Sequence, residues 1–216
     1  MSLWQHQDLY CERLSSDLWA EPLNATTNLA FLLAALWVRP RSPLGAWLLV
    51  SIGLGSALFH TLARTWSMAA DVIPIAVFVA IALHRTARVH LQLSWGRVAG
   101  LGALSALPAL LLWPAVADPA AMGVAYLPAI LLLALFARSF HQRGHPGADR
   151  LSLSSLVLGV AWGLRALDAW SCAFIPVGTH FLWHLLAALG LGLVAQAVLT
   201  PAAPPHNPPP TAAPPA

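Results

Sequence analysis

Residues 55–74 read GSALFHTLARTWSMAADVIP, the end of one apolar run and the start of the next. His60 closes the first run, Asp71 opens the second, and Ser56 lies about one helical turn before His60. An ionisable side chain within a membrane-spanning run is costly, and it marks a functional site by default. We therefore expect apolar helices to decide the fold and these few polar groups to decide the function.

The composition of the whole chain is typical of a membrane protein. Its 216 residues are 58% hydrophobic and only 9% charged, whereas soluble domains have roughly 25% charged residues. This difference excludes a water-soluble globule. The net charge is +3, and the basic residues are scattered singly between apolar runs, so a nucleic-acid partner is excluded as well.

Seven apolar runs approach the length that a membrane requires, and proline, glycine or charged residues separate them. We expect membrane-spanning helices at residues 23–38, 44–62, 68–83, 98–116, 121–140, 151–170 and 179–199. The predicted fold is an all-α membrane protein, a seven-transmembrane helix bundle within residues 23–200. An acidic segment, 1–22, precedes the bundle, and the Pro- and Ala-rich residues 201–216 are expected to form a disordered tail.

The arginines predict the orientation, because loops rich in Lys and Arg stay in the cytoplasm. Eight of the 11 basic residues fall between runs on one side, and three, Arg13, Arg64 and Arg165, fall on the other. We expect the N-terminus outside, the C-terminus in the cytoplasm, and the polar groups towards the outer side. The composition, rich in Ala, Arg, Pro and Gly and without Lys, favours a bacterial plasma membrane.

Two further histidines, His180 and His184, open the last run within THFLWH. Residues four apart share one helix face, with Cβ atoms about 5 to 6 Å apart, which suits two zinc ligands. A pair of hydrogen-bonded core histidines would have the same spacing. His60 is expected at the same depth, and three histidine ligands leave a fourth tetrahedral position to water, as in catalytic zinc sites.

Ser56 and Asp71 are the remaining polar candidates at this depth. Ser56 shares a helix face with His60, and Asp71 is the acid beside the three histidines, where it fits as an acceptor for a proton from water or from a ring N–H. The other histidines are expected to be solvated. They are His84, His90, His141, His145 and His206.

Three blocks of the sequence resemble the signature blocks of the alkaline ceramidases. They are YCERLSSDLWAEPLNATTNLAF (10–31), GSALFHTLARTWSMAADVIP (55–74) and THFLWH (179–184). Within these blocks the family's order of polar residues recurs: Ser56, His60 four residues later, Asp71 eleven residues after that, and the distant pair His180 and His184. The alkaline ceramidases belong to a superfamily of seven-span membrane hydrolases that also includes the adiponectin-type receptors.

The resemblance implies a zinc ion held by His60, His180 and His184, with Ser56 and Asp71 as the remaining catalytic groups. It also implies a disulfide between Cys11 and Cys172, which the expected topology places on the same, oxidising side.

The family also has a calcium site in its N-terminal segment. Glu12 and Glu21 match that site, whereas Asp8 lies one residue further from the cysteine than the family's Asp, and Leu14 replaces an expected Asn. Calcium needs six to eight oxygen ligands. Two interpretations of this segment therefore remain. It forms a calcium site at Asp8, Glu12 and Glu21, or it is a solvated acidic segment.

From these observations we expect a zinc-dependent intramembrane hydrolase that cleaves the amide bond of ceramide or a ceramide-like lipid, giving a fatty acid and a long-chain amine. Its partner is then a membrane lipid, and no protein partner is expected. The alternatives are a lipid ester hydrolase of the same superfamily, a seven-span zinc-containing receptor or signalling protein, and a transporter or haem protein.

Overall fold

The computed structural model describes residues 2–112 and 119–201. Within them the regular structure is helical, and one isolated antiparallel bridge joins His6 and Arg64. The helices are α1 (Pro22–Thr27), α2 (Leu29–Val38), α3 (Pro43–Leu62), α4 (Thr65–His84) with the π-helical turn η1 (Arg85–His90), α5 (Trp95–Leu112), α6 (Pro119–Gln142), α7 (Ala148–Ala166), α8 (Asp168–Ser171) and α9 (His180–Val198). The end of the expected run 98–116 and residues 202–216 of the expected tail lie outside the described part.

Five helices in the described part are long and apolar enough to cross a membrane. They are α3, α4 with η1, α5, residues Val124–Gln142 of α6, and α9. The prediction of an all-helical membrane protein is confirmed at this level. The other two expected runs are also helical, but Pro22–Val38 is shorter, and α7 contains Asp149, Arg150 and Arg165.

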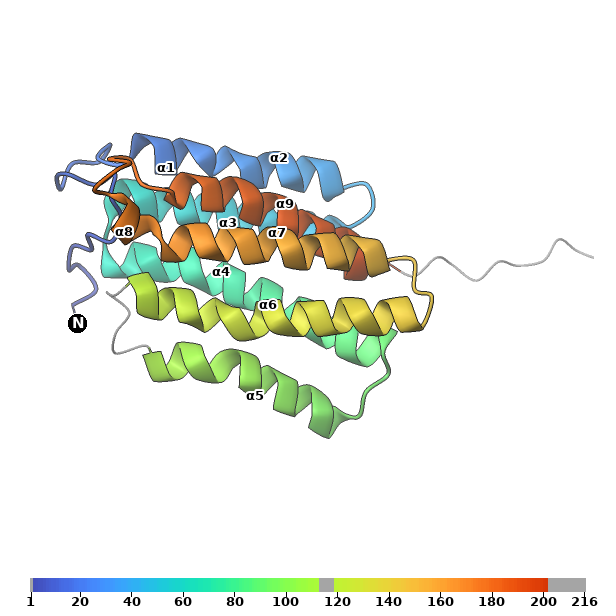
Figure 1. The fold of residues 1–216 in the computed structure, drawn as a ribbon. Helices are drawn as coiled ribbons and strands as arrows, with labels where there is room; N and C mark the ends of the chain where they lie inside the picture. The colour runs from blue at the N-terminus through green and yellow to red at the C-terminus, as the bar shows by residue number, and fades with distance from the viewer. Residues whose placement is uncertain (1, 113–118, 202–216) are drawn as a thin grey trace, which may run out of the picture.

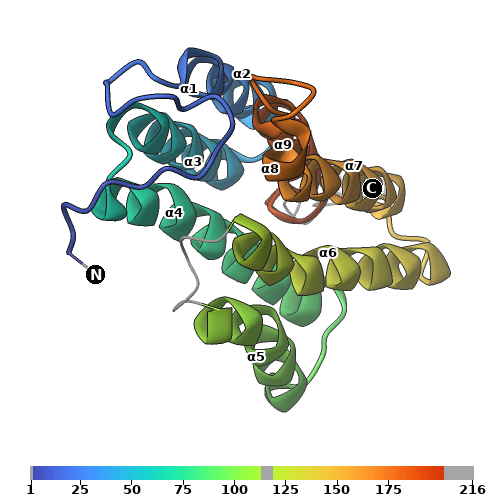
Figure 2. The same ribbon diagram turned by 60° about the vertical axis from the view of Figure 1, so that its left-hand side comes forward.

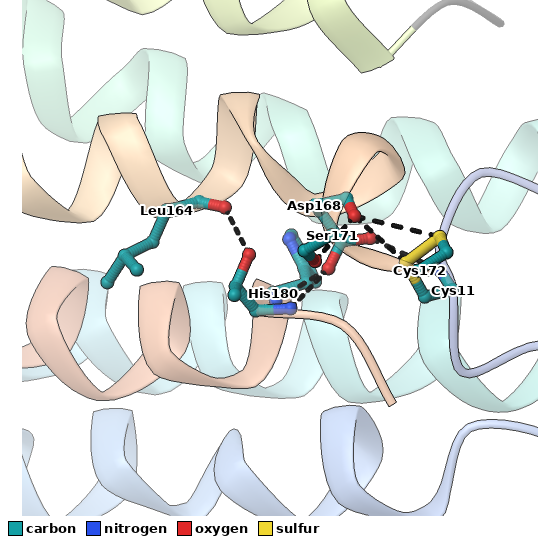
Figure 3. Close-up of a disulfide and its surroundings, with 7 residues drawn as sticks. Cys11, Leu164, Asp168, Ser171, Cys172 and His180 are labelled. Atoms are coloured by element: carbon teal, nitrogen blue, oxygen red, sulfur yellow. Dashed lines mark hydrogen bonds between the residues drawn. A yellow bond between two sulfur atoms is a disulfide. The ribbon is translucent and has the colours of Figure 1, made fainter. Parts of the chain in front are cut away.

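The long helices lie side by side, with α5 at the edge and α9 well buried (Figure 1). At one end the N-terminal segment crosses the ends of the helices and comes close to α8 (Figure 2). A disulfide between Cys11 and Cys172 fastens it there, as predicted (Figure 3). We call this the disulfide end of the bundle, and the end at which α9 stops the opposite end.

A glycine allows α3 and α4 to approach closely near the disulfide end. A Cβ atom on Gly55 would lie 2.0 Å from the carbonyl oxygen of Ala70, so no larger residue fits without moving a helix. Gly55 precedes Ser56, and Ala70 precedes Asp71. The contact therefore brings the polar side chains of the two helices together.

Candidate metal centre

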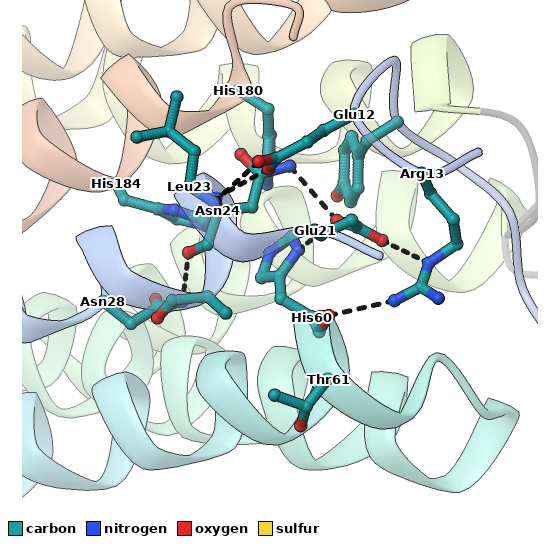
Figure 4. Close-up of polar contacts among 12 residues, drawn as sticks. Glu12, Arg13, Glu21, Leu23, Asn24, Asn28, His60, Thr61, His180 and His184 are labelled. Carbon is teal, nitrogen blue, oxygen red and sulfur yellow. Dashed lines mark hydrogen bonds and ion pairs between the residues drawn. The ribbon is translucent and has the colours of Figure 1, made fainter. Parts of the chain in front are cut away.

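Three histidines from two helices meet at the disulfide end (Figure 4). His60 comes from α3 and His180 and His184 from α9, and all three are fully buried. One ligand nitrogen from each ring lies within 4.8 Å of the other two. In the described part of the chain, no other group of three or more His, Cys, Asp or Glu residues comes this close.

The Nε2 atom of each of these three histidines lacks a hydrogen-bond partner among the described residues. Buried polar atoms are nearly always hydrogen-bonded, because an unpaired one loses its interaction with water without compensation. Three such atoms at one place have the chemistry of a metal-ligand set. The cluster could therefore hold a metal ion, and three imidazoles suit zinc.

The other nitrogen of His60 is held by Glu21. Nδ1 of His60 lies 2.5 Å from Oε2 of Glu21, and Nε of Arg13 donates to Oε1 of the same carboxylate at 2.5 Å. Burial alone would raise the pKa of Glu21, but the hydrogen bond with His60 and the charge and hydrogen bond of Arg13 outweigh it and lower this pKa. An ionised carboxylate only accepts, so His60 carries its proton on Nδ1 and presents a lone pair on Nε2.

Thr27 holds His184 in the same way. Its hydroxyl donates to the carbonyl of Leu23 at 2.8 Å, so its oxygen is left to accept from Nδ1 of His184 at 2.9 Å. The proton of His184 is therefore on Nδ1, and its Nε2 is a free lone pair. For His180, Nδ1 lies 3.5 Å from Nη1 of Arg165, at the outer limit of a hydrogen bond, and this contact does not fix the proton.

Asp168 sets the start of α9 and thereby the position of His180. Its Oδ1 accepts from the backbone N–H of Thr179 at 2.6 Å and of His180 at 2.9 Å, and its Oδ2 accepts from the N–H of Cys11 at 3.2 Å (Figure 3). The Tyr10 ring stacks on His180 at 3.7 Å between centroids. The N-terminal segment thus packs directly on the candidate ligands.

Ser56 and Asp71 are both buried beside the cluster. The carboxylate of Asp71 interacts electrostatically with His60 and with the Ser56 hydroxyl, although neither Ser56 Oγ nor Asp71 Oδ1 has a partner at hydrogen-bond geometry in the described part. The two expected catalytic groups therefore face the same buried region as the candidate ligands, and both retain hydrogen-bonding capacity for a further molecule.

The expected calcium ligands have other partners. Glu12 accepts from the backbone N–H groups of Leu23 at 2.6 Å and Asn24 at 2.8 Å, at the start of α1, while Glu21 is taken up by His60 and Arg13. Asp8 is exposed. In the described part these three residues do not form a group of potential metal ligands, hydrogen bonds engage both glutamates, and the calcium site stays a prediction.

The expectation of solvated histidines holds for His84 and His141, which are exposed. It is wrong for His90 and His145, which are partly buried at the opposite end and lie 3.1 Å apart between Nδ1 and Nε2. They come from separate segments, η1 and the loop before α7, so no sequence spacing could have paired them.

An apolar cavity of about 100 Å³ adjoins the cluster. Among its lining residues are Phe31, whose ring meets His184 edge-on, and Trp183, which stacks on His180. Further lining comes from α4, α6 and α7, for example Phe78, Tyr126 and Leu158. The buried polar groups thus lie beside a hydrocarbon-lined space.

Comparison with protein-family models, with curated proteins and with solved structures gives no match for this chain.

Sequence reasoning missed Arg13, Thr27 and Asp168. Arg13 was counted only as a loop arginine, yet its Nη2 donates to the backbone carbonyl of His60 at 2.9 Å (Figure 4). A helix-capping acid normally directly precedes its helix, whereas Asp168 lies 12 residues before His180. No local pattern marks such contacts.

Proposed function

We propose that this protein is a zinc-dependent membrane hydrolase that cleaves the amide bond of ceramide or a ceramide-like lipid. The observation that carries the proposal is the set of three unpartnered Nε2 atoms of His60, His180 and His184, buried beside Ser56 and Asp71. The adjoining apolar cavity supports a lipid substrate. The sequence resemblance to the alkaline ceramidases favours the amide bond.

The three histidines would hold the zinc ion, with Glu21 and Thr27 orienting two of the rings. Bound there, zinc supplies Lewis-acid chemistry, since it polarises a carbonyl and makes water acidic enough to react near neutral pH.

Asp71 and Ser56 have the two remaining catalytic roles in this proposal. The Asp71 carboxylate accepts a proton from the attacking water and delivers it to the amide nitrogen as the C–N bond breaks. The Ser56 hydroxyl donates a hydrogen bond to the carbonyl oxygen while negative charge develops there. One water is consumed, and the products are a fatty acid and a long-chain amine.

The proposal includes a seven-span arrangement in which α1 with α2, and α7, also cross the membrane. The disulfide end would face the outside, because disulfides persist in oxidising compartments. In a bacterium the membrane would be the plasma membrane. A lipid would enter from the bilayer, and no protein partner is required.

The test is hydrolysis of a panel of matched lipid amides and lipid esters by the purified protein, with zinc measured on every sample. We expect the amides to be cleaved, and Asp71→Asn to retain zinc while its turnover falls by about 10² to 10⁴-fold, the usual worth of general acid–base catalysis. Asp149→Asn, at an exposed site on α7, is the control and should match the wild type.

Turnover of esters alone would reassign the protein as a lipid ester hydrolase. A zinc-loaded protein that cleaves neither class would refute hydrolysis. Undiminished turnover in zinc-replete Asp71→Asn would remove Asp71 as the general base.

A further inference from the structure

A groove lies between α2 and α3, towards the opposite end of the bundle, where a short loop joins the two helices (Figure 1). Its volume is about 990 Å³. Its walls are apolar, and they include Leu32 and Leu36 of α2 and Trp47 and Val50 of α3. Among the described residues that line it, Arg39 alone is charged. The groove is therefore a hydrocarbon-lined space with one cation where the helices meet their loop.

Arg39 has no counter-charge. It is exposed, and none of the ion pairs in the described part includes it or Arg41, which is exposed in the same loop. The sequence holds no Asp or Glu between Glu21 and Asp71, so neither helix nor the loop supplies a carboxylate. Arginines are common in the loops of membrane proteins, but Arg39 also lines an apolar groove. This combination indicates a ligand that is both anionic and apolar.

The depth of the groove in the bundle suits a membrane lipid. α3 is one of the helices long enough to cross a membrane, and Trp47 lies on its second turn with 72% of its surface exposed. Tryptophan prefers the level of the lipid headgroups, so Arg39 and the loop lie at that level as well. Leu32 and Val50 lie further along the helices, beside hydrocarbon.

A second copy of this chain fits the groove poorly. A symmetric dimer through this face would bring the two Arg39 side chains together, and like charges at an interface are costly. The exposed acids of the described part are Asp8, Asp17 and Asp149, and none of them belongs to α2 or α3. The face therefore offers no carboxylate that could pair with Arg39 across such an interface.

We infer that an anionic phospholipid occupies this groove, with its phosphate on Arg39 and an acyl chain between α2 and α3. A guanidinium donates two parallel charge-assisted hydrogen bonds to phosphate oxygens. A zwitterionic lipid carries an ammonium group beside its phosphate, and the charges of Arg39 and Arg41 repel it. The groove thus prefers anionic to zwitterionic lipids with the same chains. This lipid lies away from the three histidines, so the inference does not depend on the proposed hydrolysis.

The experiment measures equilibrium binding of dioleoyl phosphatidylglycerol and dioleoyl phosphatidylcholine to the purified full-length protein in detergent. The buffer holds about 0.15 M salt, at which attraction between distant exposed charges is largely screened. We expect the wild type to bind phosphatidylglycerol at least about tenfold more tightly, the size of effect that a hydrogen-bonded charge produces. Inorganic phosphate at the same concentration should not displace it, because phosphate gains nothing from the apolar walls.

Two changes at Arg39 and one matched control locate the site. Arg39→Gln should remove most of the preference, while Arg39→Lys should keep part of it, because an ammonium retains the charge without the planar pair of donors. Arg97→Gln removes an exposed arginine on the first turn of α5, at the same end, and should leave the preference intact.

Equal affinities for the two lipids in the wild type, a result that requires no variant to fold, would overturn the inference. Equal losses in Arg39→Gln and Arg97→Gln would overturn it too, because the preference would then reflect the overall positive charge. Displacement of the lipid by phosphate alone would show a site for a free anion, in which the groove has no part.

Discussion

Two groups of histidines lie at the two ends of α9, and they differ in what their ring nitrogens contact. At the disulfide end the Nε2 atoms of His60, His180 and His184 have no hydrogen-bond partner within residues 2–112 and 119–201. At the opposite end His90 and His145 have a partner for every nitrogen.

The hydrogen bonds at the opposite end have a single direction. The backbone N–H of Gly147 donates to Nδ1 of His145 at 3.0 Å, so His145 carries its proton on Nε2 and donates to Nδ1 of His90. His90 then donates from Nε2 to the carbonyl of Val198 at 3.2 Å. Adjacent histidines can therefore have a purely structural role, and the unpartnered Nε2 atoms, as judged from the described residues, distinguish the candidate metal site.

The largest expected effect is on zinc content. His184→Ala removes one of three ligands, and we expect the purified protein to fall from about one zinc per chain to almost none. His145→Ala, the matched change at the opposite end, should keep the metal. Elemental analysis of both variants decides the matter. Full zinc retention in His184→Ala, or equal loss in both, would erase the distinction between the two groups.

A smaller effect is expected from the groups that hold the rings. Thr27→Val keeps the shape but removes the acceptor for Nδ1 of His184, so we expect zinc affinity to fall by about 10 to 100-fold. Thr26→Val is the control, since the Thr26 hydroxyl is exposed and bonds only to backbone carbonyls. Competition with a metal-sensitive dye measures both. Identical affinities in the two variants would contradict the role of Thr27.

The smallest effect is a pH dependence of stability. Partial burial, together with the nearby charge of His90, lowers the pKa of His145 below its ordinary value of 6.5. The unfolded chain then binds the proton more readily, so this contribution to stability is complete above about pH 6.5 and is lost as the pH falls below it. Protonation would also place an N–H against the N–H of Gly147.

Thermal unfolding between about pH 7.5 and 5 tests this, because that range covers histidine titration. The wild type should lose more stability over the range than His145→Gln, which cannot titrate. The charged neighbours Arg85 and Arg143, which donate to Val198 and Leu91, stay protonated throughout and contribute equally to both proteins. An equal loss of stability in the two proteins over this pH range would contradict the hydrogen-bond directions assigned to His145 and His90.

Much of the fold followed from the sequence, because apolar runs of membrane length leave the backbone few choices. Depth alone predicted that His60, at the end of one run, and His180, at the start of another, would meet. The pairing of Cys11 with Cys172 came from the resemblance, and the structure confirms it. The apolar runs, the depths of the histidines and the side of the membrane on which each cysteine lies all depend on the order of residues along the chain, which the sequence gives directly.

The hydrogen-bond partners of the candidate ligands could not be predicted, because these contacts depend on how separate segments pack. Nothing near Thr27 in the sequence indicates that its oxygen faces a histidine 157 residues later. The same holds for Arg13, which reaches Glu21 and the carbonyl of His60 only after the N-terminal segment folds over the bundle.

The disulfide sets an order of events during biogenesis. It joins positions 161 residues apart, so it can close only after most of the chain has left the ribosome. Tyr10, Glu12 and Arg13 flank Cys11, and each needs groups from later segments to complete its contacts. The first segment to be synthesised is therefore among the last to be placed, and a truncated chain that ends before α8 lacks both the second cysteine and two of the three histidines. An incomplete chain of this kind therefore cannot carry the complete histidine cluster.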